Sequence, residues 1–337
     1  MAKIRKLSIL DRPKIKEMIS FLTLDVSSHY SRIFVPFPID IAHSLLPLKY
    51  KWLPESYVGV NGSKLNALVS VLPCRGNKFK LKIIKFFLNE NSYETGAQLI
   101  EYIFSHYGAL GVNTFFSSID YKHEELLDLL IKNCGFRLCS SEQIWKINQA
   151  PVFNNIIGDE YNIREFVNKD ADIISDINND NIYPYYRYSI ASNGSEYKTY
   201  DLFGLCKNVN QKFVIENKKT KKICGYFNIE SENGIDYIFD IIVVQYIEDL
   251  FNDIVNCIIN QIKRKKSHFN LYFVNKKYKT TGVKYENFLR LNNSELKSEQ
   301  AFLVKDFYKP IKDTNKLIRS AVLFSDISGK VAFKIKK

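Results

Sequence analysis

The chain has 337 residues, of which 46% are hydrophobic and 25% are charged, and its formal net charge is +12. This length favours about two domains that each bury a core, and the composition excludes a disordered chain. No apolar run is long enough to span a bilayer, and the first residues lack the apolar region of a signal peptide, so we expect a cytoplasmic protein.

The first part of the sequence predicts strands and helices in alternation. Residues 3–8 alternate like a strand, and Asp11 followed by Pro13 predicts the start of a helix that runs to Leu22. The Asn61-Gly62 turn between residues 56–60 and 65–72 predicts a β-hairpin. Apolar periodicity predicts further strands at 82–88, 112–119 and 141–148, and helices at 39–46, 95–107 and 123–133.

The same order then repeats after a predicted linker in which Pro151 and Gly158 interrupt the periodicity. An irregular aromatic insert at 183–200 either covers the sheet or lines an acceptor pocket. The residues after 310 contain a helix start and a strand-like segment to which we assign no role. Strands are expected at 161–166, 212–216, 223–230, 235–244, 269–274 and 300–307, and helices at 170–177, 247–264 and 285–291.

Three short sequence echoes at nearly constant spacing predict a duplicated domain. Arg5 and Asp11 recur about 159 positions later as Arg164 and Asp170. Asn91 with Glu94 recurs as Gln245 with Glu248, and Ser-Glu-Gln at 141–143 recurs at 298–300. Repeats this long indicate twin globular units. We therefore predict a first domain at 1–150, a linker at 151–160, a second domain at 161–312 and an extension at 313–337.

The cysteines and histidines predict no metal site. The six cysteines are scattered, and apolar surroundings favour buried, reduced thiols. Cys134 and Cys139 are the only close pair, and no second pair stands at zinc spacing. Three basic clusters, at 218–222, 263–266 and 276–279, favour solvated faces, although they also suit an anionic partner such as a phosphorylated cofactor.

The repeated order of elements resembles the GNAT superfamily of acyl-CoA-dependent N-acetyltransferases. Its sequence marks are the Ile-Arg and Asp opening of each unit, and the segment from Leu130 to Phe136 that precedes the Trp145 strand. The resemblance implies an α/β (α+β) fold with two tandem GNAT-like domains, each a mixed central β-sheet flanked by helices.

The resemblance also implies that acetyl-CoA, or another acyl-CoA, is the cofactor. In this family a Gly-rich loop before a helix binds the pyrophosphate through backbone N–H groups. The matches here, Asn91 to Gly96 and Gln245 to Leu250, both carry Glu at the place of the first glycine, and that carboxylate repels phosphate unless it points away. The cofactor residues implied are Leu88, Asn91, Tyr93, Glu94, Thr95, Gly96, Ala97, Val244 and Gln245.

The catalytic residues implied by the resemblance lie in the second unit. Family members use a tyrosine of the last helix as general acid, and Tyr285 stands at that position, whereas the first unit has Ile131. Asp236 and Asp240 share one face of their strand and are candidates for the general base. Backbone N–H groups near Leu88 or Val244 would hold the thioester carbonyl.

These residues lead to an acyl-CoA-dependent N-acyltransferase that acts on an unidentified amine, with one unit degenerate. Two alternatives remain open. The first is a non-catalytic ligand- or protein-binding module on two eroded folds, which the two Glu residues favour. The second is a transferase that takes its acyl group from aminoacyl-tRNA, which the positive charge permits.

Overall fold

The structure, a computed structural model, describes residues 2–11, 13–15 and 55–307, except for residues 63, 75, 90, 149, 151–155, 200–208 and 232–233. Most of the predicted helix that ends at Leu22, the predicted helix at 39–46 and the predicted extension at 313–337 lie outside these residues. Below, the first half means the described residues up to 150, and the second half means those from 156 onward.

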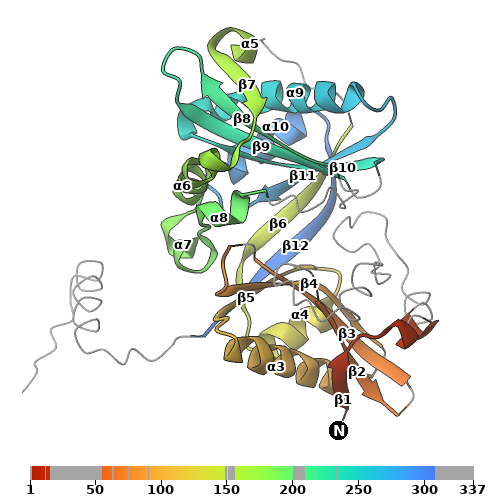
Figure 1. Cartoon of the computed structure of the whole chain (residues 1–337). Coiled ribbons are helices and arrows are strands. Elements are labelled where there is room, and N and C mark those ends of the chain that lie inside the picture. The colour runs from red at the N-terminus through yellow and green to blue at the C-terminus, as the bar shows by residue number, and fades with distance from the viewer. Residues whose placement is uncertain are drawn as a thin grey trace, which may run out of the picture. The chain divides into compact units, whose positions relative to one another are not determined.

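In the described residues, twelve strands form one hydrogen-bonded sheet, with the order β1-β2-β3-β4-β5-β12-β6-β11-β10-β9-β8-β7 (Figure 1). The first half contributes β1 (Lys3–Lys6), β2 (Glu55–Asn61), β3 (Lys64–Pro73), β4 (Lys80–Leu88), β5 (Thr114–Asp120) and β6 (Arg137–Ile147). The second half contributes β7 (Tyr161–Glu165), β8 (Val209–Asn217), β9 (Ile223–Ser231), β10 (Asp236–Val243), β11 (Asn270–Lys276) and β12 (Glu295–Asp306).

The last strands of the two halves are exchanged. β12 lies between β5 and β6, and β6 pairs with β11, so that Trp145 stands opposite Phe273. Each half therefore completes its part of the sheet with a strand from the other half. The predicted α/β (α+β) architecture, a mixed sheet flanked by helices, is confirmed. The exchange that joins the strands of both halves into one sheet was not predicted, because the alternation of a strand specifies its two faces but not its partner.

The hydrophobic core follows the same exchange. One cluster lies against α3 (Tyr93–Ala109) and includes Ala301 and Leu303 of β12. A second lies against α9 (Phe251–Lys263) and α10 (Gly282–Leu291) and includes Trp145 of β6. On the opposite face of β8–β10, α6 (Ala171–Asn181) packs through Ile174 and Ile177. Each exchanged strand thus contributes apolar side chains to the hydrophobic core of the other half.

Most predicted strands and helices are confirmed, and the differences have local causes. The predicted hairpin is confirmed, with Gly62 at φ +60°, but Asn61 is the last residue of β2 and pairs with Lys64, so the turn begins after it. The aromatic insert is helical, with α7 (Pro184–Ile190) and α8 (Gly194–Tyr197), and Pro184 stands in the first turn of α7, where a missing N–H costs nothing. Residues of the predicted linker form α5 (Ile156–Glu160). The predicted helix at 247–264 begins with a 3-10 turn, η5 (Gln245–Leu250), because Ile247 has non-helical angles.

The first echo in the sequence forms the same ion pair twice. The Arg5 guanidinium donates two hydrogen bonds, of 2.7 and 2.6 Å, to Asp11, and Arg164 donates two, of 2.8 and 3.0 Å, to Asp170. Each carboxylate also accepts a backbone N–H three residues earlier, from Ser8 and Val167. The repeated sequence therefore forms the same structural element twice, an ion pair that joins a strand to the turn after it.

The described helices include none that is both long and apolar enough to cross a lipid bilayer.

Candidate active site

Two pairs of parallel strands separate part-way along their length. The β4–β5 ladder ends at Ile83 and Ser117, although β4 continues to Leu88. The β10–β11 ladder ends at Phe239 and Phe273, although β10 continues to Val243. We call these the first fork and the second fork. Where parallel strands part, their backbone groups need other partners, so a fork is a place where a ligand can enter the sheet.

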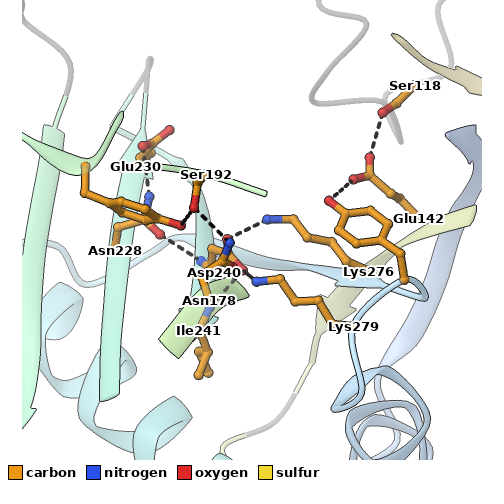
Figure 2. Close-up of polar contacts among 12 residues, drawn as sticks. Ser118, Glu142, Asn178, Ser192, Asn228, Glu230, Asp240, Ile241, Lys276 and Lys279 are labelled. Carbon is orange, nitrogen blue, oxygen red and sulfur yellow. Dashed lines mark hydrogen bonds and ion pairs between the residues drawn. The ribbon is translucent and has the colours of Figure 1, made fainter. Parts of the chain in front are cut away.

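A charged cluster lies at the second fork (Figure 2). Asp240 is the first residue of β10 beyond the ladder, and its Oδ2 lies 2.5 Å from Nζ of Lys276. Nζ of Lys279 lies 3.8 Å from Oδ1 of the same carboxylate. The Lys279 side chain is only 6% exposed, against 26% for Asp240. One partly accessible carboxylate thus holds two lysines, one of which is buried.

The pKa values of the three groups follow from this arrangement. Burial would raise the pKa of Asp240, but the positive charges of Lys276 and Lys279 outweigh burial and leave that pKa below its ordinary value. For Lys276, the carboxylates of Asp240 and Glu142 outweigh burial and raise the pKa. For Lys279, burial dominates and lowers the pKa to about 8. Lys279 is therefore the group of the cluster whose pKa lies nearest neutrality.

The strand exchange extends this cluster into the first half. Glu142 of β6 stands opposite Lys276 in the β6–β11 ladder. Its carboxylate accepts hydrogen bonds from Ser118 Oγ, at 2.7 Å, and from the Tyr278 hydroxyl, at 3.1 Å. On the other side, Asp240 stands opposite Asn228 of β9. A row of polar residues therefore crosses the sheet at the second fork, with members from both halves.

Side chains of the protein cap the backbone of β10 at this fork. Oδ1 of Asp240 accepts the Ile241 N–H at 3.0 Å, and Nδ2 of Asn181 donates to the Val243 carbonyl at 2.7 Å. The Val244 N–H, predicted as a donor to the thioester, instead donates to the Cys224 carbonyl at 2.8 Å. That amide is therefore not free, because β9 extends alongside the end of β10.

Buried polar atoms that form no hydrogen bond gather in the segment from the end of β11 into α10. Among the described residues, six buried side-chain atoms form no hydrogen bond, and four of them belong to residues 275–285, namely Asn275 Oδ1, Lys279 Nζ, Thr280 Oγ1 and Tyr285 Oη. Because an unpaired buried polar atom costs about 1–3 kcal/mol, such a concentration indicates a place for a polar ligand.

Tyr285 lies within the core of the second half. Its ring stacks on Phe251 with 4.6 Å between centroids, and the residue is 2% exposed. Thr281 approaches the hydroxyl without a hydrogen bond of ordinary geometry. Burial, together with the charges of Glu248 and Asp240, raises the pKa of Tyr285 well above its ordinary value. This phenol therefore keeps its proton.

The overall arrangement is similar to that of solved acetyltransferase structures. A tandem GNAT protein from the clavulanic acid biosynthesis pathway, solved without AcCoA, superposes with a TM-score of 0.58 at 9% identity, over 92% of this chain and 100% of that one. A GCN5-related N-acetyltransferase from Sphaerobacter thermophilus superposes with a TM-score of 0.58 at 12% identity, over 92% of this chain and 97% of that one. The chain has the GNAT fold. No protein-family model matches the sequence, and no curated protein matches it either.

The two forks of this GNAT fold carry different residues. Asp240 is the first residue beyond the second ladder, and the same position beyond the first ladder is occupied by Ile84. The tyrosine position of the last helix is Tyr285 in the second half, whereas Ile131 of the first half lies on a π-helical turn, η3 (Leu129–Asn133), and is 38% exposed. Among the described residues, an acid candidate and a base candidate therefore stand together only in the second half, where the charge of Asp240 acts on Tyr285.

In the first GNAT-type loop, the glycine allows close packing between a helix and a strand. Gly96 is buried, and a Cβ there would lie 2.5 Å from Leu88 Cδ2, so glycine permits α3 to pack closely on β4. Glu94 is exposed and accepts a hydrogen bond from Gln98, one turn further on.

The other predicted residues of this loop have structural contacts. Asn91 has a positive φ of 56°, and the Tyr93 hydroxyl donates to Asn133 of the π-helical turn. Thr95 is buried, and Ala97 packs against the core.

The second GNAT-type loop begins with an exposed residue, Gln245, at the start of η5. Leu250, at the place of the last glycine, is buried in the core. The Glu248 carboxylate lies 3.6 Å from Lys284 Nζ, which also lies 2.9 Å from Asp249. In both loops the glutamate is held by a neighbouring polar side chain, Gln98 or Lys284.

The two predicted base candidates are separated. Asp236 is buried at the closed end of the β10–β11 ladder, opposite Asn270, which donates to it at 2.7 Å. Only Asp240 lies at the fork. The expectation that the 276–279 basic cluster is a solvated face is wrong for Lys276 and Lys279, and no sequence pattern marked Asp240 as their shared partner. The described residues also contain no group of three or more His, Cys, Asp and Glu side chains that would hold a metal ion.

Proposed function

We propose that the protein transfers an acyl group from acetyl-CoA, or another acyl-CoA, to an amine at the second fork, in the cytoplasm. The first half then serves as a scaffold that supplies β6 and Glu142. This proposal keeps the predicted domains at 1–150 and 161–312. The observation that carries it is that Asp240 and Tyr285 flank the fork with the unpartnered atoms, whereas Ile84 and Ile131 stand at the matching places of the first half.

The residues at the second fork suit an acyl-CoA. Asn275 Oδ1 and Thr280 Oγ1 are hydrogen-bonding atoms without partners, and an amide-rich chain such as that of CoA would satisfy them. Gln245 and Lys284 lie at the loop where the fold family binds phosphate groups. When bound, the cofactor supplies an activated acyl thioester.

The charges at the fork suit an amine acceptor. The Asp240 carboxylate stays ionised and partly accessible, so it can accept a hydrogen bond from an ammonium group and orient it. Lys279, with a pKa of about 8, is better matched than Asp240 to take up the proton that the amine must lose. Tyr285 keeps its proton and can donate it to a leaving thiolate. In the net reaction an N–C bond forms, a C–S bond breaks and the nitrogen of the ammonium group loses two protons, of which one goes to Lys279 and then to solvent and the other replaces the proton that Tyr285 gives to sulfur.

Calorimetry of the full chain with acetyl-CoA tests the proposal. We expect one binding site per chain and slow thioester hydrolysis or transfer to simple amines. Asp240→Asn should lower the turnover about 100-fold or more while binding persists. Asp236→Asn, at the closed end of the same strand, tests the other predicted base. Absence of acetyl-CoA binding by the wild-type chain, or equal loss in the two variants, would contradict the proposal.

One observation favours a second candidate, a non-catalytic binding module. Asp240 and Asn181 already cap the backbone of β10, as a bound ligand would. Asn181→Ala distinguishes the candidates, because it frees the Val243 carbonyl. If acetyl-CoA binds neither the wild-type chain nor this variant, the fork is closed and the binding-module reading is favoured. If the variant binds more tightly, Asn181 competes with the ligand and the acyltransferase reading is favoured.

A further inference from the structure

The second half contains a cavity of about 270 Å³ that is separate from the fork. It lies between the edge strand β7 and the last turns of α9, and β9 and β8 stand between β7 and the fork strand β10. The residues around it include Ile163, Phe213, Cys257, Asn260, Gln261 and Arg264. Phe213 and Ile163 belong to the core under α9, so the floor is apolar and the rim is polar.

The strands and the helix that form the walls of this cavity correspond to strands and a helix of the first half. Tyr57 stands opposite Lys6, next to Arg5, and Phe213 stands opposite Glu165, next to Arg164, so Phe213 occupies the place of Tyr57. In the helices, the buried set Leu99, Ile100 and Ile103 has the same spacing as Ile254, Val255 and Ile258. This alignment places Cys257 at the position of Tyr102, and Gln261 at the position of His106.

In the first half, two rings fill the matched space. Tyr102 and His106 are parallel, with 5.7 Å between centroids and an interplanar angle of 4°. Both lie beside Tyr57, with centroids 5.7 and 5.9 Å from its ring. The fold therefore accommodates a stack of planar rings at this place. In the second half, Cys257 and Gln261 are smaller. Phe213, which is 8% exposed, stacks on Phe227 of β9 with 5.0 Å between centroids, and the positions of Cys257 and Gln261 add no further ring to it.

The side chains at the rim of the cavity favour an uncharged ligand. Arg264 donates to Gln261 Oε1 at 3.5 Å, and Glu165 stands at the same rim with the opposite charge. Arg164 also borders the cavity, but its guanidinium is bound to Asp170 and Glu216. The rim is therefore close to neutral, and the amides of Asn260 and Gln261 offer both donors and acceptors.

We propose that this cavity is a binding site for a small, uncharged aromatic molecule. Its ring lies on Phe213, as Tyr102 and His106 lie beside Tyr57, and a polar substituent such as a carboxamide meets Asn260, Gln261 and Arg264. Ring stacking on an aromatic floor and a few placed polar groups are the usual features of small-molecule sites. The proposal does not depend on acyl transfer, because the cavity and the fork are separate.

Benzamide is a suitable probe for the full chain. We expect saturable binding in ligand-observed NMR titrations, with a dissociation constant on the order of 1 mM or below. Cyclohexanecarboxamide, which has the same substituent on a non-planar ring, should bind at least about 10-fold more weakly, since it cannot stack. Absence of saturable benzamide binding, or equal affinity for the two probes, overturns the proposal.

Two pairs of substitutions test the site, because each pair gives one half the side chains that the other half carries at the corresponding positions. Cys257→Tyr with Gln261→His should fill the cavity with the rings of the first half, abolish benzamide binding and leave acetyl-CoA binding unchanged. The reverse pair, Tyr102→Cys with His106→Gln, should open the matched space and add a second benzamide site. If the filling variant does not fold, the reverse pair decides. Unchanged benzamide binding in the filled and folded variant contradicts the proposal, and so does a stoichiometry that stays at one in the opened variant.

Discussion

Lys276 reaches across the open end of the second fork and binds Asp240, with 2.5 Å between Nζ and Oδ2. The backbone ladder between β10 and β11 has already ended at Phe239 and Phe273, so this ion pair links two strands that no longer share ladder hydrogen bonds. Lys279 approaches the same carboxylate from the turn after β11. Asp240 is therefore both the base candidate of the fork and the group that neutralises its two lysines.

We expect Asp240→Asn to destabilise the fold, because it leaves Lys276 and the buried Lys279 without a counter-ion. The cost should be about 1–3 kcal/mol in the free energy of unfolding, measured by urea denaturation at pH 7. Asp128→Asn is the control. Asp128 pairs with Lys132 on an exposed helix surface, where solvent screens the charges, so this substitution should change the stability far less. Equal effects of the two substitutions would mean that the fork lysines find other partners.

Lys279 should make the stability of the protein rise with pH. Its pKa falls from 10.5 to about 8 on folding, so between these values the unfolded chain binds more protons than the folded one, and stability increases with pH. Lys279→Met removes this dependence. The variant should be more stable than the wild type at pH 7, by about 1–3 kcal/mol, and the difference should shrink between pH 8 and 10.

Chemical denaturation at several pH values measures this effect. Titration of other groups cancels in the difference between wild type and variant. Lys132→Met, which removes an exposed lysine, is the control and should run parallel to the wild type across this range. Parallel curves for Lys279→Met as well would contradict a lowered pKa at this position.

The two arginine–aspartate pairs should contribute alike to stability. Burial would raise the pKa of Asp11 and of Asp170, but hydrogen bonds from Arg5 or Arg164 and from a backbone amide outweigh it and leave each pKa below its ordinary value. Each pair thus stabilises the fold above the ordinary aspartate pKa of about 4, and this contribution is lost as the pH falls through the folded pKa.

Asp11→Asn and Asp170→Asn should each lower the free energy of unfolding at pH 7 by about 1–3 kcal/mol. Each difference from the wild type should diminish in acid, where the native carboxylates are protonated as well. Measurement of both variants at pH 7 and at a series of lower pH values tests this. A large effect of one substitution and none of the other would mean that the repeated sequence does not have a repeated structural role.

The sequence predicted local structure well because local chemistry determines it. Gly62 determines the hairpin turn by its tolerance of positive φ, and the apolar spacing of Leu99, Ile100 and Ile103 determines the buried face of α3. The exchange of β6 and β12 was not predictable, since Trp145 and Leu303 would be buried equally in either half. A hydrophobic pattern predicts that a residue is buried, but it does not predict which helix covers that residue.

The candidate site was predicted only in part for the same reason. The resemblance seen in the sequence named Asp240 and Tyr285 as candidates, and their catalytic roles stay predictions. Lys279 was not, because in sequence it belongs to a basic cluster of the kind that is normally solvated, and its burial follows from contacts with β10. Glu142 lies more than one hundred positions from Lys276, and only the exchange of strands brings them together.

Gly96 should be required for packing and not for phosphate binding. In Gly96→Ala the new Cβ would lie 2.5 Å from Leu88 Cδ2 and 3.3 Å from Phe86 Cζ, so the Leu88 side chain or the helix must shift within the packed core. We expect a cost of about 1–3 kcal/mol that exceeds the gain in helix propensity. Leu88→Ala removes the nearest atom, so in that background Gly96→Ala should be neutral or stabilising.

A double-mutant cycle on Gly96 and Leu88, followed by thermal and urea denaturation, measures this coupling. Gly108→Ala in the same helix is the control, because nothing lies within 4 Å of its added Cβ, and it should stabilise the protein by about 0.5–1 kcal/mol. If Gly96→Ala weakens acetyl-CoA binding without loss of stability, and Leu88→Ala does not alter its effect, then Gly96 contacts the ligand and the packing role is contradicted.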